Sequence, residues 1–70
     1  MQTFRITEKA NLQSFRAPQL TPAKDLNDAI DFADENQSFE GTIIVIENAT
    51  GSAVLAIKDS AGNWAVVEND

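Results

Sequence analysis

Carboxylates at helical spacing are the side chains of this sequence best suited to chemistry. Asp28, Asp31, Asp34 and Glu35 lie in a segment, residues 25–47, that contains no basic residue. Acids three or four positions apart are neighbours on a helix surface, where like charges repel. Such a face suits solvent or a basic partner. It does not suit a metal ion, because a helix face cannot wrap a cation and no EF-hand ligand pattern is present.

The sequence contains few residues that could act in enzyme catalysis. The sequence contains no His and no Cys, so a Ser or Thr nucleophile would lack the usual base. Lys24 or Lys58 could serve as a base only if deeply buried. The glycines at 41, 51 and 62 stand singly, which excludes a glycine-rich phosphate loop. We therefore predict a protein that is not an enzyme and that holds no cofactor and no metal.

The charge balance narrows the class of partner. Eleven acidic and five basic residues give a net charge of −6. Nucleic acids and anionic membrane surfaces are recognised by clustered Lys and Arg, so direct binding to either is not expected. The apolar runs, Ile43–Ile46 and Ala53–Ile57 among them, are all too short to span a bilayer. With no targeting segment visible, we expect a cytoplasmic location.

The N-terminal part has one clear strand and one ambiguous segment. Apolar and polar residues alternate over 3–7, which is typical of a half-buried strand. Residues 12–17 fit either a strand or a helical turn, and a strand that forms a hairpin with the first is favoured. Pro18 and Pro22 indicate an extended connector over 18–21.

A helix is predicted over residues 22–35. Thr21 is a good N-cap, Pro22 suits the first helical position, and Asn36 is a plausible end. The apolar stripe expected to face the core consists of Ala23, Leu26, Ala29, Ile30, Phe32 and Ala33.

Three strands of period two follow, over 41–47, 53–58 and 63–67, joined by turns at Gly51 and Gly62. The first two are apolar on both faces, and one short helix cannot cover both sides of a sheet. Val45 and Val54 are therefore candidates for a contact with a partner or with a second copy of the chain. Trp64 either closes the edge of the core or anchors a binding surface.

At seventy residues, 1–70 is expected to form one small α+β domain. Its predicted order is β-β-α-β-β-β, a mostly antiparallel sheet with one helix on one face. The leading function is a non-enzymatic protein-binding or regulatory module that acts through protein contact, with a homodimer as one form. The alternative is an acidic inhibitor that imitates nucleic-acid charge, such as a phage-type antagonist of a DNA-binding complex. A further alternative is a structural accessory subunit.

Overall fold

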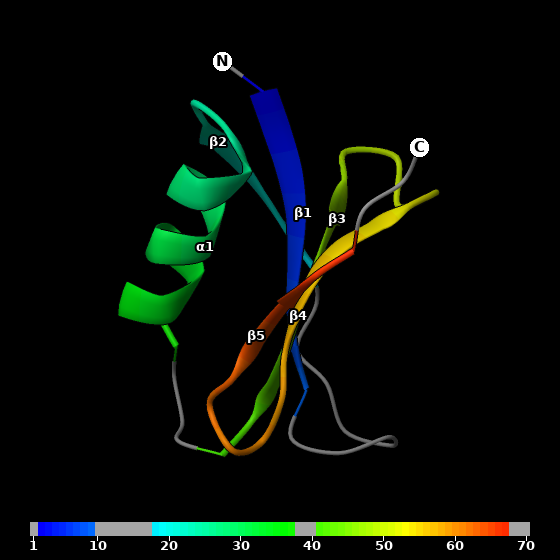
Figure 1. Ribbon diagram of the computed structural model, residues 1–70. Coiled ribbons are helices and arrows are strands. Elements are labelled where there is room, and N and C mark those ends of the chain that lie inside the picture. Colours follow the sequence, from blue (N-terminus) through cyan, green and yellow to red (C-terminus); the bar gives the residue numbers. More distant parts are fainter. Residues whose placement is uncertain (1, 10–17, 38–40, 68–70) are drawn as a thin grey trace.

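The computed structural model describes residues 2–9, 18–37 and 41–67. Its elements, in chain order, are β1 (Gln2–Lys9), β2 (Gln19–Ala23), α1 (Leu26–Glu35), β3 (Ile43–Asn48), β4 (Val54–Lys58) and β5 (Trp64–Val66). The strands form one antiparallel sheet in the order β2-β1-β3-β4-β5. Helix α1 covers one face of this sheet (Figure 1). The predicted α+β class and element order are confirmed.

The second strand lies further along the chain than predicted. Of residues 18–21, expected as a connector, 19–21 belong to β2, while the predicted strand at 12–17 lies outside the described residues. Thr21 and Pro22 both pair with β1, so neither begins the helix and that prediction is wrong. A proline cannot donate to a sheet ladder, but β2 is an edge strand and tolerates it.

Helix α1 begins at Leu26, four residues later than the predicted range 22–35. Asp25 is the N-cap: its backbone is extended and its carboxylate accepts the N–H of Asp28 at 2.9 Å. The carboxylate of Asp28 in turn accepts the N–H of Lys24 at 3.0 Å. The second bond goes to the residue before the N-cap, so the arrangement is a variant of the capping box; together the two bonds satisfy the backbone donors of Asp28 and Lys24. Asp25 can cap because it lies two residues beyond Ala23, the last residue of β2.

The end of α1 was predicted correctly at Asn36. Its backbone N–H and its side-chain amide both donate to the carbonyl of Phe32, at 3.0 and 2.9 Å. Its φ of −104° shows that the helix ends without a left-handed residue. No helix in the described part of the chain is long and apolar enough to cross a membrane.

The core lies between α1 and the helix-facing side of the sheet. Ile46 is fully buried, and Ile44 nearly so, because alternate residues of β3 point at the helix. The buried positions of α1 are Ala29 and Ala33, and because these side chains are small the helix lies close to the sheet. The buried apolar residues are Phe4, Ala23, Ala29, Ala33, Ile44, Ile46 and Ala56.

The face of the sheet away from α1 was expected to be apolar and uncovered, but its central residues are partly or fully buried. Val45 lies in register with Thr7 and Ile57 on that face; Thr7 is buried, and Val45 and Ile57 are half-buried. Val54 is also half-buried, beyond a register shift in the pairing of β3 with β4. Self-association through this face stays a prediction.

Candidate functional site

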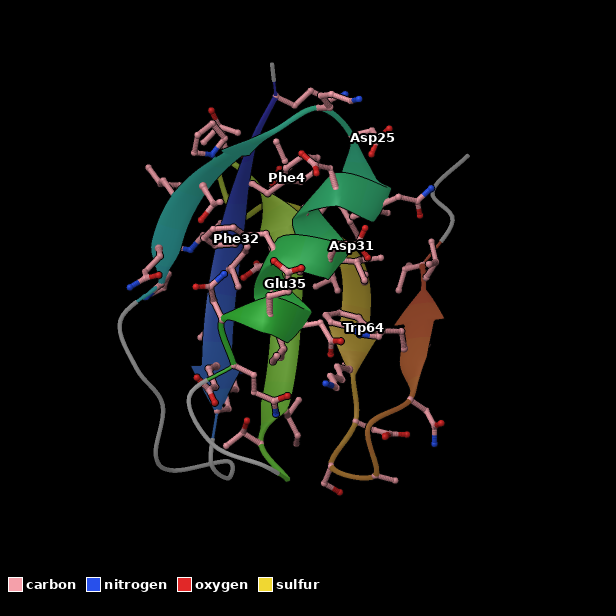
Figure 2. All side chains as sticks on the ribbon, turned by 90° about the vertical axis from the view of Figure 1, so that its left-hand side faces the viewer. Phe4, Asp25, Asp31, Phe32, Glu35 and Trp64 are labelled. Atoms are coloured by element: carbon pink, nitrogen blue, oxygen red, sulfur yellow. The ribbon has the colours of Figure 1, made fainter. Side chains whose placement is uncertain are left out.

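The outer side of α1 carries the exposed carboxylates. Asp31 and Glu35 point away from the sheet on neighbouring turns (Figure 2). Within the described residues neither carboxylate makes a hydrogen bond or an ion pair. Both are exposed, as the helical spacing predicted, and their contact with a partner stays a prediction.

Asp28 and Asp34 were predicted as part of the same acidic group, and the structure gives both of them internal contacts. The carboxylate of Asp28 takes part in the N-terminal cap of α1. That of Asp34 is bound by the ammonium group of Lys58. These two acids consequently help to hold the helix in place, and any contact with a partner would come in addition.

A chain of polar contacts ties the end of α1 to the sheet. Lys58 Nζ donates to Asp34 Oδ1 and, at 2.8 Å, to Gln37 Oε1. Gln37 Nε2 donates to Thr42 Oγ1 at 2.8 Å, and Thr42 Oγ1 donates to Glu8 Oε2 at 2.7 Å. These polar contacts thus link the end of α1 to three parts of the sheet region: β1, β4 and the segment that precedes β3. Sequence reasoning missed them, although Lys58, two residues after Ala56 in an alternating strand, falls on the helix-facing side.

The two side chains of the Lys58–Asp34 ion pair differ in their exposure to solvent. The Lys58 side chain is 11% exposed and that of Asp34 is 54% exposed. Hydrogen bonding and charge attraction from Lys58 lower the pKa of Asp34, against a smaller opposing effect of burial. Trp64 Nε1 is buried with no hydrogen bond of good geometry in the described residues, and it adds the smallest lowering of that pKa.

This pKa direction predicts an acid-dependent loss of stability. A carboxyl group whose pKa is lower in the folded state stabilises the fold above its unfolded pKa, and this contribution disappears as the pH falls through the folded value. Wild-type protein should therefore lose stability more steeply than Asp34→Asn as the pH falls below about 4. Urea unfolding at a series of acid pH values measures this difference. Lys58→Met, which removes the same pair from the other side, should flatten the slope similarly; an unchanged slope in both variants would contradict the assignment.

Phe32 is the largest departure from the predicted site. The sequence placed it in the buried stripe, but it is 41% exposed. It lies on the flank of α1 above β1, whereas Trp64 lies on the opposite flank, above β4 (Figure 2). The sequence already indicated this exposure. Phe32 lies four residues after Asp28 and three before Glu35, so on a helix it borders the acidic residues as well as the apolar stripe.

Beside Phe32, a small hollow of about 60 Å³ opens between α1 and the sheet. Its lining is half apolar and half polar. It consists of Ile6, Glu8, Gln19, Phe32, Ala33, Asn36, Gln37 and Ile44. The volume suits a water molecule or two and is too small for a substrate.

The other predicted partner-binding residues do not join this surface. Trp64 is half-buried against the core, which agrees with the reading that it closes the core edge. Val45 lies on the face of the sheet away from α1. The residues described hold no group of three acids that could bind a metal ion. The acidic side of α1 and Phe32 are thus the exposed groups taken as the candidate site.

Comparison with known proteins shows a strong relationship to a solved structure. No protein-family model and no curated protein sequence matches the chain. Among solved structures, AcrIF9, a phage anti-CRISPR protein, matches it with a TM-score of 0.82 at 30% sequence identity. The match covers 100% of this chain and 92% of AcrIF9. Identity at this level over nearly the whole of both chains shows common descent as well as a common fold, and the chain belongs to the AcrIF9 family.

Proposed function

We propose that this protein is a non-enzymatic inhibitor of a CRISPR effector complex and acts by direct protein contact. The match to AcrIF9 over the full chain carries this proposal. It favours the phage-type inhibitor over the general regulatory module. A small rigid domain without catalytic groups can inhibit a much larger assembly by occupying a surface that the assembly needs.

The charge of the protein suggests which surface that is. CRISPR effector complexes hold nucleic acid in positively charged channels. This chain has a net charge of −6, and Asp31 and Glu35 present free carboxylates on a rigid helix. Negative charge on this face attracts a basic protein surface and repels nucleic acid. The inhibitor would therefore occupy a basic surface and exclude the nucleic acid that normally lies there.

The direct test uses a purified type I-F effector complex with its guide RNA, the subtype suggested by the name of the relative. Binding of fluorescent target DNA is measured by anisotropy with increasing inhibitor. We expect target DNA binding to fall as inhibitor is added, and the effect to weaken at high salt because charge attraction is screened. Undiminished DNA binding, together with no retention of the protein on the immobilised complex, would contradict the proposal.

A pair of matched variants isolates the acidic face. Glu35→Gln and Glu47→Gln change the net charge equally, but Glu47 lies opposite Arg5 on the far side of the sheet. Glu35→Gln should weaken inhibition by up to about fivefold, in line with the loss of one exposed charge pair, and adding Asp31→Asn should weaken it further. Glu47→Gln should leave it nearly unchanged. Equal effects at both sites would assign the weakening to net charge and remove the role of α1.

A further inference from the structure

An exposed aromatic ring borders the free carboxylates of α1. Phe32 is 41% exposed, whereas Phe4, the other phenylalanine among the described residues, is 3% exposed. On the helix surface Phe32 adjoins Glu35, and Asp31 lies further round the outer side of α1 (Figure 2). Exposing a large apolar side chain to water is costly, and aromatic residues, phenylalanine included, are enriched at the buried centre of protein contacts.

The ring is held on a rigid support. The backbone carbonyl of Phe32 accepts two hydrogen bonds from Asn36, and these fix the last turn of α1. The polar chain from Lys58 through Gln37 anchors the residue that follows Asn36 to the sheet. The backbone that carries Phe32 therefore needs little ordering on binding, so more of the burial energy of the ring appears as affinity.

We propose that Phe32 is the apolar anchor of the inhibitory contact and inserts into an apolar pocket of the partner protein that is rimmed by Lys or Arg. The proposal rests on the function proposed above and adds the residue that determines affinity. In this arrangement the ring supplies the buried centre of the contact, and Asp31 and Glu35 supply its charged rim. Central aromatic residues dominate binding energy, whereas rim charges mainly accelerate association.

Charge complementarity selects this partner over a second copy of the chain. A two-fold contact through the same surface would place Asp31 and Glu35 opposite their own copies, and like charges across an interface oppose association. An anionic membrane would be repelled for the same reason. A basic protein surface is attracted by the carboxylates and can accept the ring.

The test compares Phe32→Ala with Leu20→Ala on the immobilised effector complex. Leu20 is 65% exposed and lies opposite Arg5, on the face of the sheet away from α1, so its truncation is a matched control for the loss of exposed apolar surface. Surface plasmon resonance at low and high salt separates the association and dissociation rates. Circular dichroism melts confirm that both variants are folded.

Phe32→Ala should raise the dissociation rate at least about tenfold and leave the salt dependence of association unchanged. Leu20→Ala should stay within about twofold of wild type. Phe32→Leu should restore part of the affinity. Dissociation of Phe32→Ala within about twofold of wild type, or an equal loss in Leu20→Ala, would overturn the role of Phe32 while leaving the inhibitor proposal intact. Failure of wild-type protein to bind the complex would overturn both.

Discussion

Replacing Phe4 by alanine should destabilise the protein by about 3–5 kcal/mol. Phe4 is 3% exposed and belongs to the core cluster, so its truncation leaves a cavity as well as losing apolar burial. Chains of this size have a total stability of only about 3–10 kcal/mol. Much of the variant should therefore be unfolded in the absence of denaturant. Urea unfolding followed by circular dichroism, with the wild type alongside, measures the loss.

Phe32→Ala is the matched control for Phe4→Ala, because the chemical change is the same. With 41% of its surface already exposed, Phe32 should contribute roughly 1 kcal/mol to stability. A loss in Phe32→Ala as large as that in Phe4→Ala would mean that Phe32 belongs to the core, and would remove it from the binding surface.

The second large effect is expected at Ile46, which has no exposed surface. Ile46→Ala should cost about 2–5 kcal/mol, and Ile46→Val about 0.5–1.5 kcal/mol, because the loss grows with the volume removed. Ile43→Ala removes the same atoms from a half-buried position of the same strand and should cost clearly less. The measurement is again urea unfolding. Similar losses at the two positions would show that β3 does not present alternate residues to the helix.

Local periodicity was sufficient to predict most elements of this fold. The alternation in β1, β3, β4 and β5 and the existence of α1 follow from patterns within short segments. β2 was missed because two prolines normally indicate a connector, whereas an edge position accommodates Pro22. Which strand lies at the edge depends on the pairing of the whole sheet. The helix start was misplaced for the same reason, since the pairing of Thr21 with β1 left Asp25 to cap.

Only part of the candidate site could be predicted from the sequence. Helical spacing was enough to place Asp31 and Glu35 on the outer face of α1. The contact between Asp34 and Lys58 joins residues 24 positions apart and depends on how α1 lies across the sheet. The exposure of Phe32 depends on the same tertiary detail, because the width of a helix's buried stripe is set by the surface beneath it. Contacts of this kind cannot be derived from periodicity alone.

The position of β1 inside the sheet governs the order in which the protein can fold. β1 pairs with β2 and also with β3, where Phe4 opposes Asn48. Contacts between distant residues form slowly, because a long loop must close before they gain energy. During synthesis, the first strand therefore has one unpaired edge until most of the chain has left the ribosome. Shortened or stalled chains would expose that edge of β1 to other unfolded strands, and the pairing of β3 removes this one site of aggregation.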